Sequence, residues 1–259
     1  MAQEKFDFQT VRGAKKGDSS EGIEKVQLFL QKYGYFQTSD FKSGPIFDDD
    51  MTSAVQLYQH FHGLDVTGEL DDPTLSEMSK PRCGFPDFPQ LADFSLAARK
   101  WSKKKLTYKI INFSPDLPQS EQVEAIAAAF SLWDKACGLT FERVNGQADI
   151  DIKFEAGAHG DGADFDGPGS VLAHAFFPPP NGGRLAGDAH FDEAEKWHHK
   201  LPLPRATIDL LTVAAHEFGH SIGLGHSRTR GALMFPSYSG PQRYLANDDV
   251  SRARALYGK

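Results

Sequence analysis

The spacing of apolar residues divides the chain into two parts. In the first 80 residues, apolar positions recur with the period of a helix in EGIEKVQLFLQKYGYF and in MTSAVQLYQHFHGL. The run DVTGELDDPTLSEM follows, with capping residues and a proline near an expected helix start. Three short helices around one small core would satisfy this pattern. We therefore predict a small three-helix domain over residues 1–80.

From Trp101 onward, short apolar runs alternate with longer helical patterns. Five strands are predicted in LTYKIINF, LTFERV, ADIDIKF, SVLAHAFF and DAHFD. Three helices are predicted in PQSEQVEAIAAAFSLWDKA, TIDLLTVAAHEFGHSIG and NDDVSRARALYG. The second part, residues 101–259, should therefore be an α+β domain with a twisted five-stranded mixed sheet. Residues 81–100 are rich in proline and other turn formers and would form an exposed linker.

Length and charge narrow the possible functions. The 259 residues are enough for two small domains, each with its own core. The net charge of -7 argues against a nucleic-acid partner, which would favour a basic face. No apolar stretch approaches the length of a membrane span.

The segment HEFGHSIGLGH, residues 216–226, carries the most specific chemistry. His216 and His220 are four residues apart and would share one face of a helix. Gly223 can leave the right-handed helical region at little cost, which would bring His226 to the same metal ion. A zinc ion with three neutral imidazoles keeps an open position, and its bound water has a pKa of about 7. Glu217 would take the proton of this water and return it to the leaving amine, so the pattern predicts amide hydrolysis.

Cys83, in PRCGFPD, suggests how such an enzyme could be kept inactive. A thiolate is a strong zinc ligand and could occupy the position of the water. The alternative is a thiol without function in a proline-rich linker. Cys137, in LWDKACGLTF, lacks such a context. We expect it to be buried and unreactive, because a disulfide to Cys83 would compete with this inhibition.

Residues 158–197 contain further histidines and acidic residues at regular spacing. Four of these residues would supply three nitrogens and one oxygen, a closed tetrahedral ligand set suited to a structural zinc. They are His159, Asp161, His174 and His190. Hard oxygen donors suited to calcium are Asp166, Asp192 and Glu195, beside the glycine-rich loop DGPGSV. The alternative is a solvated acidic loop, although loops of this length without metals are uncommon. The remaining histidines are given no metal role, and His198 and His199 are expected in an exposed polar stretch.

Several motifs together resemble one family. HExxHxxGxxH with a methionine downstream in ALMFP resembles the metzincins, and HSRTRGALMFPSY is similar to the matrixin branch, the matrix metalloproteinases. PRCGFPD resembles the matrixin cysteine switch. Residues 19–80 resemble the matrixin propeptide and related peptidoglycan-binding-like modules, most clearly in GLDVTGELDDPT. The resemblance covers nearly all of the chain from about Glu21 to Gly258.

The resemblance implies roles for further residues. Cys83 would bind the catalytic zinc in the latent form, with Arg82 and Asp87 bracing the loop as an ion pair. The first calcium would also take the carbonyls of Gly167, Gly169 and Val171. A second calcium is implied at Asp149, Asp188 and the carbonyls of Arg184 and Ala186, where the family has glycines at the last two positions. Met234 would be the Met-turn residue beneath the zinc ligands, and the specificity pocket would be formed by Thr212 and the wall from Pro236 to Tyr238. A small residue at position 212 suits larger apolar side chains, and an extended substrate would pair antiparallel with the strand SVLAHAFF.

The implied protein is a latent, secreted zinc endopeptidase with two zinc ions and one or more calcium ions. Expected partners are extracellular proteins such as collagen of the extracellular matrix, an activating protease and protein inhibitors of the family; we expect a monomer. The start MAQEKFDFQT lacks a hydrophobic signal, so we expect this sequence to begin after a signal peptide. It ends at LYGK, just past the last predicted helix, so we expect no haemopexin-like domain in this sequence, and the mature form should begin near Phe94.

Two other functions compete with this one. One is a cell-wall hydrolase in which the N-terminal region binds peptidoglycan and the zinc domain cuts a peptide crosslink, but PRCGFPD would have little purpose there. The other is a non-catalytic binding or structural protein, which would be expected to lack Glu217 or a zinc ligand.

Overall fold

The computed structural model describes residues 6–36, 42–89 and 100–259. The expected mature start near Phe94 lies outside these residues. The chain forms two compact units, which we describe separately. Unit 1 comprises Met1–Lys80 and Phe85–Leu91, and unit 2 comprises Pro81–Gly84 and Ala92–Lys259. The four residues around Cys83 therefore belong to unit 2.

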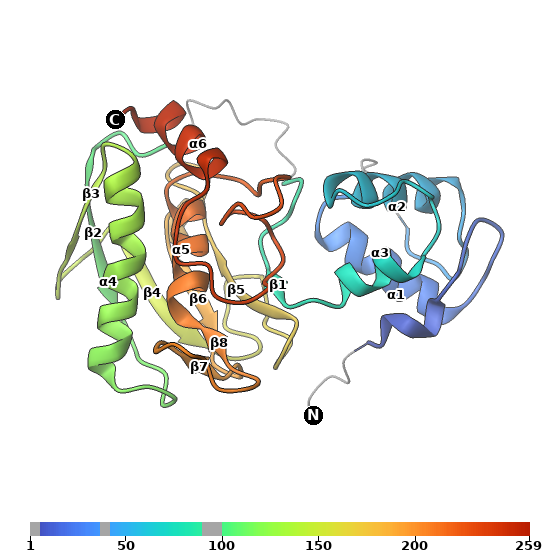
Figure 1. Cartoon of the computed structure of the whole chain (residues 1–259), viewed down its shortest axis with the longest axis horizontal. Helices are drawn as coiled ribbons and strands as arrows, with labels where there is room; N and C mark the ends of the chain where they lie inside the picture. Colours follow the sequence, from blue (N-terminus) through green and yellow to red (C-terminus); the bar gives the residue numbers. More distant parts are fainter. Residues whose placement is uncertain (1–5, 37–41, 90–99) are drawn as a thin grey trace. The chain divides into compact units, whose positions relative to one another are not determined.

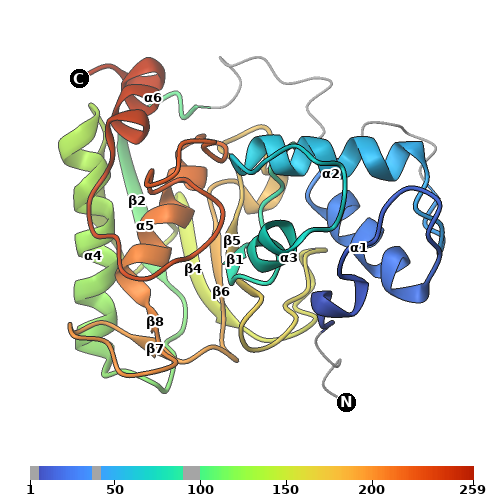
Figure 2. The ribbon, with the colours of Figure 1, turned by 45° about the vertical axis from the view of Figure 1, so that its right-hand side comes forward.

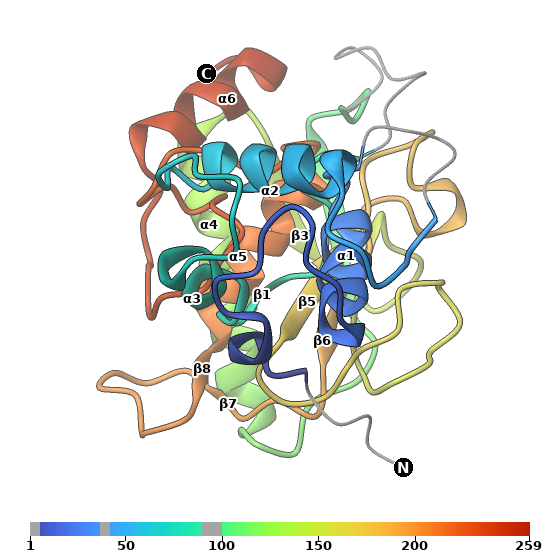
Figure 3. The same cartoon turned by 90° about the vertical axis from the view of Figure 1, so that its right-hand side faces the viewer.

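Unit 1 contains the three predicted α-helices, preceded by a short 3-10 helix that the sequence did not predict (Figure 3). The helices begin where a side chain accepts a hydrogen bond from a backbone N–H of the first turn, at Ser20, Asp48 and Asp71. Apolar residues from all three fill one small core. The elements are η1 Phe8–Val11, α1 Glu21–Lys32, α2 Asp49–Phe61 and α3 Asp72–Met78.

Unit 2 is built on a mixed sheet with the strand order β1-β5-β6-β4-β2-β3 (Figure 1). The five predicted strands are present, so the α+β prediction is confirmed. The sixth strand, β1, was not predicted because its two residues, Arg82 and Cys83, are a strand only through pairing with β5. The strands are β1 Arg82–Cys83, β2 Lys105–Ile110, β3 Thr140–Arg143, β4 Ile150–Glu155, β5 Val171–Ala175 and β6 Ala189–Asp192. Only the pair β5–β6 is antiparallel in this sheet, as far as the described residues show.

Two helices of unit 2 pack side by side on this sheet: α4, Gln119–Ala136, and α5, Leu210–Ser221 (Figure 1). The rings of Phe130 and Phe218 stack with centroids 3.8 Å apart, and the indole of Trp133 donates a hydrogen bond to the Ala215 carbonyl at 2.8 Å. Every residue of α5 is buried. The last helix is α6, Asn247–Tyr257, and no helix among the described residues is long and apolar enough to cross a membrane.

A second, two-stranded sheet pairs β7, Trp197–His198, with β8, Ile208–Asp209, next to the start of α5 (Figure 2). The expectation of an exposed stretch at His198 and His199 was wrong, since His199 is buried and His198 is half-buried. The cause is Trp197, which is buried and donates a hydrogen bond to the Asp192 carbonyl at 2.9 Å. Because this indole is buried, the two histidines that follow it in the chain also lie close to the protein interior.

Cys137 ends α4, where it is buried and its thiol donates a hydrogen bond to the Trp133 carbonyl at 3.3 Å. Burial raises the pKa of this thiol, which keeps it protonated and poorly nucleophilic. The expectation of a buried, unreactive cysteine agrees with this environment.

Gly219 lets a methionine approach the backbone of α5. A Cβ atom at this position would lie 2.2 Å from the Met234 sulfur and 2.9 Å from the Trp133 ring. Both neighbours are buried, so neither can move away without disturbing the core. The glycine, which is otherwise unfavourable within a helix, is therefore required by this close contact.

We expect Gly219→Ala to destabilise the protein by about 1–3 kcal/mol through overpacking, although alanine is the better helix former. Urea denaturation followed by tryptophan fluorescence measures the change. Gly146→Ala is the matched control, since no atom lies within 4 Å of its added Cβ. Equal stability of the two variants would contradict the proposed tight contact.

Candidate metal centre and adjoining pocket

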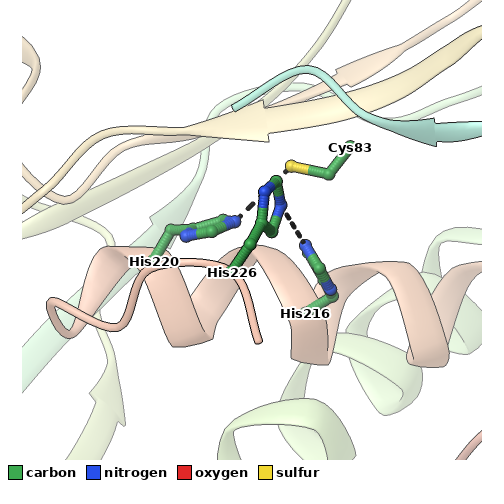
Figure 4. Close-up of side chains that lie close together, drawn as sticks. All are labelled: Cys83, His216, His220 and His226. Atoms are coloured by element: carbon green, nitrogen blue, oxygen red, sulfur yellow. Dashed lines mark hydrogen bonds between the residues drawn. The ribbon is translucent and has the colours of Figure 1, made fainter. Parts of the chain in front are cut away.

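Three histidines and a cysteine converge at α5 (Figure 4). His216 and His220 lie on one face of the helix, and Gly223, with a φ of 101°, turns the chain so that His226 returns to them. The ligand atoms of these histidines and of Cys83 all lie within 4.8 Å of one another. The Nε2 atoms of His216 and His226 are 3.2 Å apart. The sequence spacing predicted the convergence of the three histidines, and the resemblance to the matrixin cysteine switch implied that Cys83 would join them.

Backbone carbonyls orient two of the imidazoles. The Nδ1 atoms of His216 and His220 lie 2.7 Å from the carbonyl oxygens of Leu233 and Leu224, respectively, which directs Nε2 toward the cluster. Burial lowers the pKa of His220 well below its usual value, and the other two histidines lower it further. The neutral imidazole is the form that binds a metal ion. The donor set therefore fits a zinc ion with three nitrogen ligands and one sulfur ligand.

Glu217 is fully buried beside these ligands. Its Oε2 accepts a hydrogen bond from the Cys83 thiol at 3.5 Å, and its Oε1 has no hydrogen-bond partner among the described residues. Burial raises the pKa of this carboxyl to about 8, against a smaller lowering by the Cys83 hydrogen bond. The raised pKa makes the ionised carboxylate a stronger base, so a group suited to accept a proton lies at the metal centre.

The residues around Cys83 are held on both sides by the backbone of unit 2. On one side, the N–H groups of Arg82 and Gly84 donate to the carbonyls of Ser170 and Ala173 at 2.8 and 2.7 Å. On the other side, the Cys83 N–H donates to the Pro236 carbonyl at 3.0 Å. The thiol sulfur then lies 3.5 Å from Nε2 of His220. β1 runs parallel to β5 in this arrangement.

The expected ion pair between Arg82 and Asp87 stays a prediction, because the two residues belong to different units. Within unit 1, Asp87 is buried and accepts a hydrogen bond from the Tyr35 hydroxyl at 2.5 Å. Its carboxylate also lies 3.7 Å from Nε2 of the buried His62. Sequence reasoning missed both neighbours, since neither has a signal in its local sequence.

The second predicted cluster also comes together. Oδ2 of Asp161 lies 2.7 Å from a ring nitrogen of each of His159, His174 and His190. Burial would raise the pKa of Asp161, but hydrogen bonds from Ala163 and the histidines bring it below its usual value. Burial lowers the pKa of His190 to about 4. One carboxylate facing three imidazoles fits a structural zinc ion.

Three carboxylates gather at the glycine-rich loop, as expected for a calcium ion. Asp166 accepts from the N–H of Val171 at 3.0 Å, and Glu195 accepts from the N–H of Gly169. Asp192 is fully buried, and its Oδ2 has no hydrogen-bond partner among the described residues. Burial and the charge of Asp166 raise the pKa of Asp192. A divalent cation would offset this concentration of negative charge, and calcium at this loop stays a prediction.

The four residues expected at a second calcium, Asp149, Arg184, Ala186 and Asp188, line one pocket of about 480 Å³. Asp149 is engaged in other interactions: Lys103 lies 2.7 Å from its Oδ1, and Thr107 donates its N–H to Oδ2 at 2.8 Å. Arg184 donates to the carbonyl of Gly160 at 3.2 Å. Lys103 therefore places a positive charge at the expected site, and the second calcium stays a prediction.

A pocket of about 220 Å³ adjoins His216 and Glu217. The expected residues Thr212, Pro236 and Tyr238 line it. Met234 does not line the pocket. Its side chain is fully buried and contacts Gly219, which lies on the helix that carries His216 and His220.

The segment of Met234 is fixed by α6. The buried carboxylate of Asp249 accepts from the N–H groups of Leu233 and Met234 at 2.8 and 3.0 Å, and from that of Ala246 at 2.8 Å. Since the Leu233 carbonyl orients His216, this carboxylate connects the start of α6 to the metal centre. Asp249 was not predicted as a functional residue, although an acidic residue in a first helical turn is a recognisable capping signal.

Comparison with known proteins agrees with this fold and site. The matrixin family matches residues 100–258, and a putative peptidoglycan binding domain matches residues 19–78. The chain belongs to the matrixin family, and this membership implies dependence on zinc.

Three relatives match most of this chain. Stromelysin-1 of Mus musculus is 42% identical over 248 residues, which are 93% of this chain and 50% of the relative. Matrix metalloproteinase-18 of Xenopus laevis is 47% identical over 80% of this chain and 44% of its own length. Interstitial collagenase of Equus caballus is 44% identical over 92% of this chain and 50% of its own length. The chain thus spans about half the length of these relatives.

The relatives also bear on the cell-wall alternative. The matches to stromelysin-1 and interstitial collagenase cover more than nine-tenths of this chain, so they include most of the region that resembles a peptidoglycan-binding module. Their names favour the matrixin function over a peptidoglycan hydrolase. A helical module of this kind is therefore compatible with a propeptide.

Proposed function

We propose that this chain is the latent form of a secreted zinc endopeptidase, with residues 1–80 as propeptide, 81–100 as switch and linker, and 101–259 as catalytic domain. The observation that carries the proposal is the Cys83 thiol beside a three-histidine cluster, within hydrogen-bond distance of Glu217 and His220. A thiol at this point has no evident structural purpose, whereas it would block a catalytic zinc. Similarity to stromelysin and collagenase supports the same function.

The catalytic zinc would be held by His216, His220 and His226. When bound, it would polarise the scissile carbonyl and acidify a coordinated water. Glu217 accepts the proton of the attacking water and delivers it to the leaving nitrogen as the peptide bond breaks. The position of Glu217 supports this role, because its carboxyl is buried beside His216 and accepts a hydrogen bond from Cys83.

An extended substrate would pair with β5 in the place of β1, antiparallel to β5. Backbone hydrogen bonds give affinity for many sequences in such a pairing, and the adjoining pocket gives selectivity. The switch residues pair in the opposite direction, parallel to β5. A reversed backbone would not present its peptide bonds to Glu217 as a substrate does, so the same edge would hold the switch without cleaving it.

The other proposed metal sites would stabilise the catalytic domain. We propose a structural zinc at His159, Asp161, His174 and His190, and a calcium at the loop of Asp166, Gly167, Gly169 and Val171 with Asp192 and Glu195. A second calcium at Asp149 would need to displace Lys103. The proposed partners are extracellular proteins such as matrix collagen, an activating protease and protein inhibitors, and the proposed state is a monomer.

The first experiment is hydrolysis of a quenched peptide with an apolar centre by the full chain. We expect no turnover before activation, turnover after limited trypsin or an organomercurial, and loss of turnover on adding a chelator. The physical reason is that both treatments would remove the thiol from the metal. If the peptide is not hydrolysed before or after treatment, although elemental analysis finds zinc, the result would argue for the cell-wall function.

The matched variant for this assay is Cys83→Ser, which removes the thiolate and keeps the size of the side chain. It should show activity without treatment, while Cys137→Ser should stay latent. Latency that survives Cys83→Ser would contradict a role for this thiol.

Glu217→Ala should retain zinc and lose at least about 10²-fold in kcat, since a positioned general base contributes roughly this much. Turnover after activation and zinc content measure the two effects. Exposed Glu142→Ala serves as control, and undiminished hydrolysis by Glu217→Ala would refute the general-base role.

Asp192→Asn should lose most of the stabilisation that calcium gives. A ligand at 100 times its Kd stabilises by about 2.7 kcal/mol, so the wild-type melting temperature should rise clearly with calcium. Thermal unfolding with and without calcium measures the difference. Asp164→Asn, at an exposed position of the same loop, should respond like the wild type; an equal calcium response from Asp192→Asn would place the ion elsewhere.

A further inference from the structure

The wall of the pocket beside His216 is tied to the N-terminus of α5. The pocket is lined by Thr212 and Val213 of this helix and by the chain from Arg230 onward, including Tyr238, Gln242 and Tyr244. Residues 239–241, Ser-Gly-Pro, form the middle of this wall, and Gly240 has a φ of 117°. A segment of this composition is not fixed by secondary structure, so its position depends on the side chains that anchor it.

The strongest anchor is an ion pair between Arg243 and Asp209. Nε and Nη2 of Arg243 lie 2.9 and 2.6 Å from the two carboxylate oxygens of Asp209, which is a bidentate geometry. Nη2 of Arg243 also donates to the carbonyl of His199. Asp209 is fully buried, whereas the side chain of Arg243 is 25% exposed. Loss of Arg243 would leave a buried carboxylate without this ion pair.

Asp209 also holds the residue that lines the pocket. Its Oδ2 accepts from the N–H of Thr212 at 3.2 Å, as the N-cap of α5, and from the Thr212 hydroxyl at 2.5 Å. The Thr212 oxygen in turn accepts from the N–H of Gln242 at 2.8 Å. The hydroxyl proton of Thr212 is thus used within the protein, so it is not available to a substrate.

A third contact reaches the opposite part of the wall. The backbone N–H of Asp209 donates to the hydroxyl of Tyr238 at 3.0 Å. One buried residue therefore contacts Tyr238 and Arg243 directly and Gln242 through Thr212. These residues lie on either side of the Ser-Gly-Pro sequence in the wall.

We propose that Asp209 and Arg243 are positioning residues that set the length of the apolar side chain accepted by this pocket. Arg243 does not line the pocket, and acts by holding Gln242 and Tyr244. With the pair intact, the wall is fixed and the pocket accepts a side chain of limited length. Without it, the wall moves outward and longer side chains enter. This inference rests on the proposed peptidase function.

The test compares two peptides that differ only after the scissile bond, one with leucine and one with a long phenylalkyl side chain. The full chain, activated by limited trypsin, is assayed as wild type, Asp209→Asn, Arg243→Met and the double variant. Asp209→Asn keeps a side-chain oxygen for the helix cap and removes the charge. Arg205→Met, at an exposed arginine of the same unit, is the control.

We expect the ratio of kcat/KM for leucine over the long side chain to fall about tenfold in each single variant, with KM carrying the change, since pocket fit discriminates on this scale. The double variant should fall no further, because both residues act through one pair. Effects that multiply in the double variant, an equal loss for both peptides, or an unchanged ratio would each overturn the inference.

A second measurement does not depend on turnover. The same two peptides with a reduced amide at the scissile bond are titrated by calorimetry, and the ratio of their Kd values should shift as the kinetic ratio does. If the wild type binds both peptides with the expected ratio but cleaves neither, the peptidase function fails and the inference stands. If peptides are cleaved but the variants leave both ratios unchanged, the inference alone fails.

Discussion

The burial of α5 along its whole length is the constraint on which the metal centre depends. Packing against Phe130 and Trp133 of α4 fixes the rotation of α5, and the rotation fixes where its histidines point. A surface helix could carry the same HExxH spacing, but its side chains would sample many rotamers. Here packing in the core, rather than the metal ion, positions the ligand side chains. Metal binding therefore costs little conformational entropy.

Three proposed functions depend on three successive parts of α5. At its start, Asp209 caps the helix and anchors the pocket wall. In its middle lie Glu217, the proposed general base, and two of the three histidines of the proposed metal centre. Beyond its end, Gly223 and the carbonyl of Leu224 place His226 and orient His220. Selectivity, proton transfer and metal binding are therefore coupled by one rigid element, and a displacement of α5 would affect all of them.

Sequence predicted those features that rest on local pattern. The helices and five strands follow from periodicity, and the two ligand clusters follow from side-chain chemistry at close spacing. The remaining features depend on contacts between distant residues. Strand β1 exists only by pairing with β5, and His199 is buried because Trp197 enters the core. The ion pairs of Lys103 with Asp149 and of Arg243 with Asp209 join residues that have no common local signal.

The position of Cys83 in the chain has a consequence for the order of events during synthesis. The thiol precedes His220 by 137 residues, so at 5–20 residues per second it leaves the ribosome roughly 7–30 s earlier. It is also attached to the same chain, which gives it a high effective concentration at the metal centre. When His226 completes the ligand set, Cys83, the proposed blocking group, has already been synthesised. Under the proposed switch, a newly made molecule therefore has no period in which its metal centre is complete and also open to a substrate.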